Sequence, residues 1–345
     1  MNRRDLVGKI QTVLGPIAPE SLGPTLMHEH LLCDVTPPRL AAMNVPWPEI
    51  TLENYHDIIY GRVPYAPSYR MMIPEVVTDE IRKFRAAGGR AIVELTCGGI
   101  KPNPAGLAEI ARATDTQIVM GCGYYVEEYQ SPEAFERSVD DFAAEMSAQV
   151  LEGAWGSEVR AGIIGEIGCQ SPWTAHEKKV MQAAIIAQQE TGVAINVHPG
   201  RHPDQPQEAA DFIRAHGGDA SRVVISHIDR TVFDDERLLR LADSGVVLEF
   251  DLFGRETTFY SASDIDMPND GGRLKTLRML IDHGHLDRIA ISHDICTCVR
   301  LTKFGGHGYT HIFKNVLPLM RSRGFTEAEI DAILVQTPRR ILTVV

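Results

Sequence analysis

Short apolar segments alternate with longer amphipathic segments along most of this chain. The apolar segments are rich in Val, Ile and Leu and are bounded by polar, Gly or Pro positions, a pattern typical of buried strands. Eight of them predict strands, at residues 25–32, 90–96, 117–121, 161–167, 193–198, 222–227, 245–251 and 288–294. Between them, apolar positions with helical spacing predict helices at 79–87, 132–151, 175–190, 206–215, 234–242 and 272–282. This alternation predicts an α/β protein whose parallel sheet closes into a (β/α)8 TIM barrel.

Segments outside this alternation predict additions to the barrel. Residues 9–23 predict an N-terminal β-hairpin that lies under the barrel. Residues 33–75 form a long insertion with several prolines after the first strand. Extended loops at the C-terminal face of a barrel overhang the active site, so we expect this insertion to shape a substrate pocket. A Gly-rich loop at 296–309 and helices at 311–323, 327–334 and 338–344 complete the chain.

The main rival architecture is a doubly wound sheet that binds a nucleotide. Such a sheet should carry a phosphate-binding loop after an early strand. The sequence from Gly121 to Gly123 lacks the third glycine of GxGxxG, and no GxxxxGK[ST] motif occurs. We find no repeat, low-complexity tract or linker either, so we expect residues 1–345 to form one domain.

Composition and charge favour a small-molecule partner. The 46 acidic residues outnumber the 34 basic ones and give a net charge of −12, which disfavours nucleic acid or an anionic membrane surface as a partner. The six cysteines are scattered, as expected for free thiols in a reducing compartment. The first residues lack the apolar run of a signal peptide, and no stretch approaches 18 apolar residues. We therefore expect a cytoplasmic protein, and a homodimer is left open.

Two histidines on the first predicted strand are the first candidate chemistry. His28 and His30 flank Glu29, and the period of two in a strand places both imidazoles on one face. Two such side chains can converge on one metal ion. Alone, the pair is weak evidence, because paired histidines on a strand are often exposed or hydrogen-bonded.

Further ligand-type residues end four other predicted strands. They are Glu166, His198, His227 and Asp294. Carboxyl ends of barrel strands meet around one mouth, so six side chains would share one volume there. Each alone could be an ordinary core histidine or an ion-paired carboxylate. Buried together without a cation, they would leave several polar groups unpaired at about 1–3 kcal/mol each.

The six residues point to two divalent metal ions. Imidazole and carboxylate suit Zn²⁺, Mn²⁺, Fe²⁺ or Co²⁺, and we expect zinc first. Four imidazoles and a shared carboxylate exceed what one ion needs when a water must also bind. Two ions that share a water lower its pKa toward about 7 and generate hydroxide. Asp294, beside that hydroxide, could accept its proton and pass it to a leaving group, which makes it the candidate catalytic residue.

Seven segments in order resemble the phosphotriesterase family of the amidohydrolase superfamily, in the branch of phosphotriesterase-related proteins. They lie at residues 25–31 (TLMHEHL), 162–168, 197–201, 226–230, 249–254, 264–268 and 303–309. The resemblance implies that one metal is held by His28, His30 and Asp294 and the other by His198 and His227, with a fourth-strand group between them. Phosphotriesterase itself uses a carboxylated lysine there, whereas this chain has Glu166. A glutamate can still bridge two metal ions, but this difference weakens the case that the chain hydrolyses phosphotriesters.

Substrate contacts are expected from loops that follow the strands. Tyr125 follows the third strand, where its hydroxyl could bind the carbonyl under attack or its ring could pack under the loop. Four arginines follow the last four strands and could hold a carboxylate or sulfonate, although any one of them could be a surface ion pair. They are Arg201, Arg230, Arg255 and Arg300.

The resemblance and these arginines together indicate the reaction. The related-protein branch is associated with hydrolysis of N-acetyltaurine and similar N-acyl amino acids. We therefore expect a binuclear metal-dependent hydrolase of a small amide with an anionic group. The alternatives are a lactonase or a phosphotriesterase-like esterase, and then a non-catalytic ligand-binding protein.

Overall fold

Eight parallel strands form the barrel of the computed structural model, which describes residues 2–43 and 45–345. In spatial and sequence order they are β3 (Thr25–Glu29), β4 (Ala91–Glu94), β5 (Gln117–Cys122), β6 (Ile163–Gly168), β7 (Ile195–His198), β8 (Val223–Ile225), β9 (Val247–Phe250) and β10 (Ile289–Ile291). β10 returns beside β3, where the Asp294 N–H donates to the His28 carbonyl at 3.2 Å. The predicted TIM barrel and its eight strands are confirmed.

Side chains inside the barrel change from apolar to polar toward the carboxyl ends of the strands. On β9, Val247 belongs to the apolar cluster within the barrel, and the alternate positions above it are Glu249 and Asp251. On β10, Ala290 belongs to the same cluster, and the alternate positions above it are Ser292 and Asp294. Each set of alternate positions thus begins with a core residue and leads toward polar residues at the mouth, of which Asp251, Ser292 and Asp294 lie just beyond the strand ends.

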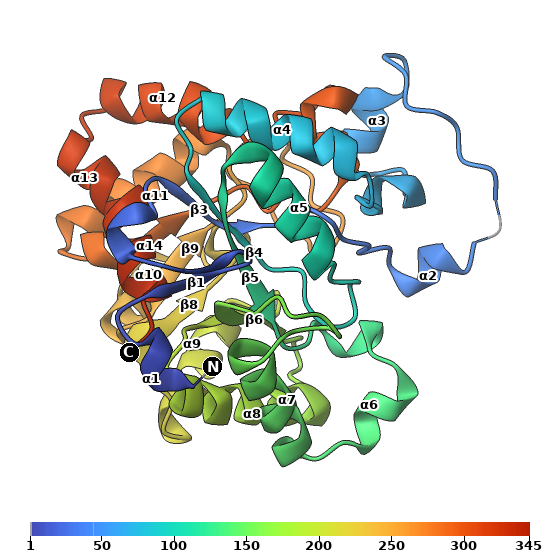
Figure 1. Cartoon of the computed structure of the whole chain (residues 1–345). Helices are drawn as coiled ribbons and strands as arrows, with labels where there is room; N and C mark the ends of the chain where they lie inside the picture. The colour runs from blue at the N-terminus through green and yellow to red at the C-terminus, as the bar shows by residue number, and fades with distance from the viewer. Residues whose placement is uncertain (1, 44) are drawn as a thin grey trace.

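Helices surround the strands, as Figure 1 shows. They are α4 (Pro74–Ala86), α5 (Pro104–Thr114), α6 (Pro132–Glu136), α7 (Val139–Leu151), α8 (Ala175–Thr191), α9 (Gln205–Ala215), α10 (Asp235–Asp243) and α11 (Asp270–Asp282). The prediction of one helix over 132–151 is wrong. Ser138 begins a new helix there, because its hydroxyl accepts the Asp141 N–H at 3.1 Å in a capping box. Helix α5 was not predicted, although Asn103 caps its start.

The predicted N-terminal hairpin closes the amino end of the barrel. β1 (Ile10–Thr12) pairs antiparallel with β2 (Gly15–Ile17), and the Val13 N–H donates to the Ile118 carbonyl at 2.8 Å. Ile10 joins the apolar cluster within the barrel. The other terminal helices are α1 (Arg3–Leu6), two π-helical segments (Ile312–Val316 and Ala332–Gln336), α12 (Leu317–Ser322), α13 (Glu327–Asp331) and α14 (Thr337–Leu342).

The insertion over 33–75 lies at the opposite end of the barrel, as predicted. It carries α2 (Pro38–Ala41) and α3 (Tyr55–Tyr60), drawn on the right of Figure 1, whereas α1 and α14 lie on the left. The ring of Tyr60 stacks on that of Phe259 with centroids 5.6 Å apart. The insertion therefore contacts the loop that follows β9.

Single turns of 3-10 helix complete the structure. They are Pro19–Ser21, Ala66–Tyr69, Glu127–Tyr129, Ala220–Arg222, Ile228–Arg230, Leu286–Arg288, Cys298–Arg300 and Thr302–Phe304. Within the described ranges, no helix has the length and apolar character needed to cross a membrane.

Candidate active site

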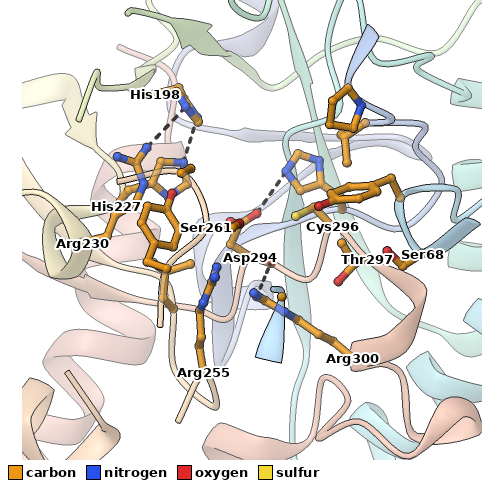
Figure 2. Close-up of a pocket in the computed structure, with 18 of the residues that line it drawn as sticks. Ser68, His198, His227, Arg230, Arg255, Ser261, Asp294, Cys296, Thr297 and Arg300 are labelled. Atoms are coloured by element: carbon orange, nitrogen blue, oxygen red, sulfur yellow. Dashed lines mark hydrogen bonds and ion pairs between the residues drawn. The ribbon is translucent and has the colours of Figure 1, made fainter. Parts of the chain in front are cut away.

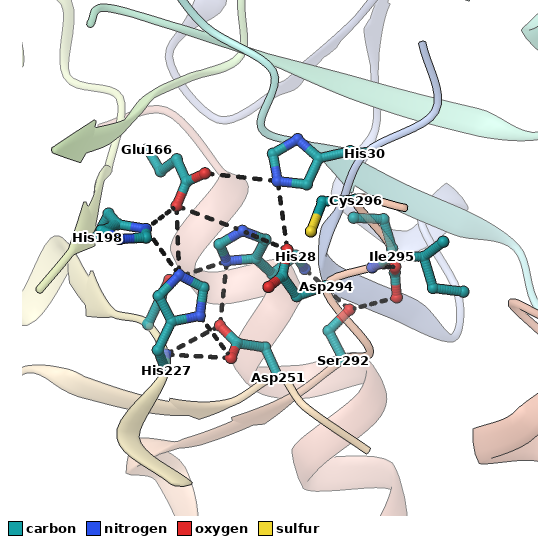
Figure 3. Close-up of polar contacts among 12 residues, drawn as sticks. His28, His30, Glu166, His198, His227, Asp251, Ser292, Asp294, Ile295 and Cys296 are labelled. Carbon is teal, nitrogen blue, oxygen red and sulfur yellow. Dashed lines mark hydrogen bonds and ion pairs between the residues drawn. The ribbon is translucent and has the colours of Figure 1, made fainter. Parts of the chain in front are cut away.

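The structure brings the six predicted ligand residues together at the carboxyl end of the barrel (Figure 3). Five of them are no more than 6% exposed, and the Asp294 side chain is 16% exposed. They are His28, His30, Glu166, His198, His227 and Asp294. They come from β3, β6 and β7 or follow shortly after the ends of β3, β8 and β10, so the meeting of the carboxyl ends of the parallel strands places them.

One half of the cluster has the spacing expected around a metal ion. His30 Nε2 lies 3.4 Å from Asp294 Oδ1 and 3.4 Å from Glu166 Oε1, and His28 Nε2 lies 3.8 Å from Asp294 Oδ1. These separations exceed good hydrogen bonds. Two ligands about 2.1 Å from one tetrahedral ion lie about 3.4 Å apart. In addition, the buried His28 Nε2 has no hydrogen-bond partner among the residues that the structure describes.

Glu166 faces the other half of the cluster with its second oxygen. Its Oε2 lies 2.8 Å from His198 Nδ1 and 3.4 Å from His227 Nε2, and these two nitrogens are 2.9 Å apart. The carboxylate therefore lies between two sets of imidazoles, which is the geometry that a bridging ligand requires. These residues fit a pair of divalent ions.

Hydrogen bonds at the far side of each ring fix how three histidines are presented. Asp251 accepts from His227 Nδ1 at 2.8 Å and lies 3.1 Å from His28 Nδ1. The Thr96 hydroxyl accepts from His30 Nδ1 at 3.0 Å and itself donates to Glu94. Each Nδ1 thus carries a proton, and each Nε2 offers its lone pair to the cluster.

Sequence reasoning missed these orienting groups. Asp251 ends a predicted strand in the same way as Asp294, which is a signal that could have identified it. Thr96 and Glu94 carry no comparable signal, because their role depends on β4 lying beside β3.

Charge in the cluster favours bound cations. Burial would raise the pKa of Glu166, but His198 and His28 hold it well below its usual range. Burial lowers the pKa of His30, yet Asp294 and Glu166 outweigh that effect and raise it to about 9. Without a metal, this buried anionic cluster would therefore hold protons, which binding of divalent ions would release.

Above the cluster lies a cavity of about 310 Å³ that Figure 2 shows from within. All five predicted substrate contacts line it. The Tyr125 ring lies edge-on to His198 with centroids 4.9 Å apart. Burial, with the nearby charge of Glu166, holds the pKa of Tyr125 well above its usual range, so its hydroxyl is a proton donor. The insertion contributes Val35, Ile58 and Tyr69 to the wall, as predicted.

The four predicted arginines are engaged to different extents. Arg230 is buried and donates to the Pro199 carbonyl and the Thr231 hydroxyl, both at 3.1 Å. Its Nη2 also lies 3.3 Å from His198 Nε2. A neutral His198 that binds a metal through Nδ1 carries its proton on Nε2, so that last contact does not match a bound ion. Pro199 and Thr231 would still hold Arg230. Arg201 donates from Nε to the Tyr260 hydroxyl at 3.1 Å.

Comparison with known proteins relates this barrel to one family. The model of the phosphotriesterase family matches residues 8–342. The chain belongs to the phosphotriesterase family. This confirms the resemblance found in the sequence.

Relatives within the family are similar over nearly the whole chain. An N-acetyltaurine hydrolase of Xenopus tropicalis is 42% identical over 98% of this chain and 99% of its own length. A phosphotriesterase-related protein of Nematostella vectensis is 39% identical over 97% and 99%. The solved structure of a resiniferatoxin-binding protein from Rhodobacter sphaeroides superimposes with a TM-score of 0.90 at 35% identity, covering 97% of this chain and 95% of that one.

Proposed function

We propose that this protein hydrolyses the amide bond of N-acetyltaurine or of a closely related short N-acyl amino acid, using two divalent metal ions. The observation that carries this proposal is Glu166, whose two oxygens face two sets of histidines beneath a small cavity lined by arginines. The relatives named as hydrolases, which span nearly the whole chain, confirm the predicted enzyme class. The particular substrate rests on the name of those relatives and on the positive charge of the cavity.

The metal-binding residues follow from the geometry of the two halves. His28, His30 and Asp294 would hold one ion, and His198 and His227 the other, with Glu166 between them. Zinc is our first candidate, because imidazole and carboxylate ligands suit it. When bound, such ions supply Lewis-acid activation of a water and of the substrate carbonyl.

Asp294 is the residue we propose for proton transfer. Its side chain is 16% exposed and lines the cavity, whereas the Glu166 side chain beside it is only 3% exposed. Burial raises its pKa, but the contact with His30 and the charges of His227 and His28 lower it, so Asp294 is ionised and able to accept a proton. An amine leaves an amide only when it is protonated, and Asp294 can return the proton to that nitrogen.

Tyr125 is proposed to orient the substrate carbonyl. Its hydroxyl is protonated, lines the cavity and belongs to a ring that packs on His198. A donor fixed at this place can bind the oxygen on which negative charge develops.

A substrate panel with metal control tests this function. Metal-depleted protein would be reloaded with Zn²⁺, Mn²⁺ or Co²⁺ and assayed with N-acetyltaurine, N-acetyl amino acids, lactones and phosphotriesters. We expect the highest kcat/KM with N-acetyltaurine or another short N-acyl amino acid, and loss of activity on chelation. Turnover of lactones or triesters without amide hydrolysis would replace the proposal with the corresponding esterase. Ligand binding without any turnover would reduce the protein to a binding function.

A further inference from the structure

The cavity wall carries positive charge that the protein itself does not neutralise. Five arginines line the cavity, and within residues 2–43 and 45–345 none of them forms an ion pair with a carboxylate: Arg39, Arg201, Arg230, Arg255 and Arg300. Acidic groups are in excess in this chain, whose net charge is −12. Elsewhere, the buried Arg273 is paired with Asp229 at 2.6 Å, and the buried Arg222 donates to the backbone carbonyls of Arg340, Ile341 and Thr343. Five guanidinium groups without a carboxylate partner around one cavity suit an anionic ligand.

Two of these arginines have their donors occupied or partly compensated. Arg230 is held by Pro199 and Thr231. Arg201 donates to Tyr260, and Glu128 lines the same cavity with a charge that acts on Arg201. A ligand anion gains less from donors that already have partners.

Arg255 and Arg300 keep most of their donors free. Among the described residues, the Arg255 guanidinium has no hydrogen-bond partner, and it lies over the Tyr260 ring at 4.6 Å from the centroid. Arg300 uses a single donor, Nη1, for the Asp294 carbonyl at 3.3 Å. In Figure 2 both guanidinium groups point toward Asp294. Burial and the nearby charge of Arg300 lower the pKa of Arg255 to about 10, so Arg255 stays cationic at neutral pH and is repelled by Arg300.

We propose that Arg255 and Arg300 together form the subsite that binds the sulfonate or carboxylate of the substrate. This inference rests on the proposed function and goes beyond it by separating this pair from Arg201 and Arg230. The planar fork of a guanidinium matches two oxygens of an acid group, and a sulfonate has three oxygens to share between two forks. The anion also relieves the repulsion between the two cations.

The position of the pair limits the substrates it can accept. Arg300 donates a hydrogen bond to the backbone carbonyl of Asp294, which is a proposed metal ligand and proton carrier. The acid group of a substrate bound to Arg300 is therefore held close to the reacting carbonyl. Only a short linker between amide and acid can connect them. Tyr260 acts as a positioning residue, since its ring supports Arg255 and its hydroxyl is held by Arg201.

A matched pair of substrates tests the subsite. The variants are Arg255→Met and Arg300→Met, with Arg112→Met on the exposed surface of α5 as a control outside the cavity. The substrates are N-acetyltaurine and its neutral analogue, in which a methyl sulfone replaces the sulfonate. For each of the two variants we expect kcat/KM for N-acetyltaurine to fall about 10- to 100-fold, mainly through KM, with little change for the neutral analogue. Arg112→Met should leave kcat/KM unchanged for both substrates.

Equal losses for both substrates would overturn the subsite, as would a selective loss of the same size in Arg112→Met. Arg255→Lys and Arg300→Lys, which keep the charge without the fork, provide folded variants if the Met forms are unstable, and we expect intermediate losses from them. Failure of the wild type to hydrolyse either amide would reject the proposed function instead.

A binding measurement addresses the subsite without turnover. Calorimetric titration of the metal-loaded Asp294→Asn protein, in which turnover is slow, with N-acetyltaurine and with sulfate compares a substrate with a free inorganic anion. We expect N-acetyltaurine to bind and both Met variants to weaken it. Binding of sulfate alone, lost in the same variants, would show an inorganic anion site and overturn the substrate role.

Discussion

Asp251 Oδ1 accepts the Nδ1–H of His227 at 2.8 Å. The same carboxylate lies 3.1 Å from Nδ1 of His28, so a single acid orients one histidine from each proposed metal set. It also accepts the His227 backbone N–H, at 3.0 Å. Because Asp251 is fully buried and outside the cavity lining, it acts through these histidines and not on a substrate.

Replacing Asp251 by Asn should therefore weaken metal binding. The amide keeps the shape but accepts the two Nδ1 protons less strongly, so the rings lose basicity and orientation. We expect metal affinity to fall about 10- to 100-fold, measured by titration of metal-depleted protein. Asp79→Asn, on the exposed surface of α4, is the control. Wild-type affinity in Asp251→Asn would show that the histidines are held without it.

Glu166→Gln should remove the link between the two ions. Elemental analysis of metal-supplemented wild type is expected to give two divalent ions per chain. The amide has one poor oxygen ligand in place of two charged ones, so metal occupancy should collapse and activity with it. Glu128→Gln, in the wall of the same cavity, should keep both ions. Full activity of Glu166→Gln without added metal would refute the bridging role.

Asp294→Asn separates metal binding from proton transfer. An amide oxygen still ligates weakly, so the fold and much of the metal content should persist. Loss of the proton carrier should lower kcat by about 10²- to 10⁴-fold. Steady-state kinetics at measured metal content check this, and near wild-type kcat/KM on the best amide would leave Asp294 as a ligand only.

The hydroxyl of Tyr260 should lose its proton at an unusually low pH for a tyrosine. Burial raises its pKa, but the charges of Arg230, Arg201 and Arg255 outweigh this and lower the pKa to about 8. Because the folded pKa lies below the unfolded value of about 10, ionisation favours the folded state. That stabilisation is full above pH 10 and is lost as the pH falls through about 8.

An absorbance titration of the phenolate band measures this directly. Wild type should show one tyrosine ionising near pH 8 that is missing in Tyr260→Phe. The phenolate would compete for the same cations, so KM for N-acetyltaurine should rise above this pH in wild type only. A first transition near pH 10 in both proteins would contradict the prediction.

The sequence predicted the barrel and the six clustered residues because both follow from position along a strand. The parallel order decides which strand ends meet, so His198 and Asp294 could be assigned to one cluster from the sequence alone. Groups that act between neighbouring strands were not predictable in this way. Thr96 reaches His30 only because β4 lies beside β3.

The four predicted arginines show a second limit of prediction from the sequence. All four follow strands and all four line the cavity, so sequence position could not rank them. What distinguishes Arg230 from Arg255 is whether a carbonyl or hydroxyl happens to lie within reach of the guanidinium. The break before Ser138 was missed for a related reason, since a capping serine inside an amphipathic run competes with helix continuation.

The inward row of β9 carries Val247, Glu249 and Asp251, and that of β10 carries Ala290, Ser292 and Asp294. Inserting or deleting one residue within either strand would turn the whole row toward the helices at once. Packing and chemistry would then be lost in the same step, with no intermediate that keeps one of them. A change of length is therefore tolerated only in the loops, where it can alter the substrate pocket and leave the spacing of the strands intact.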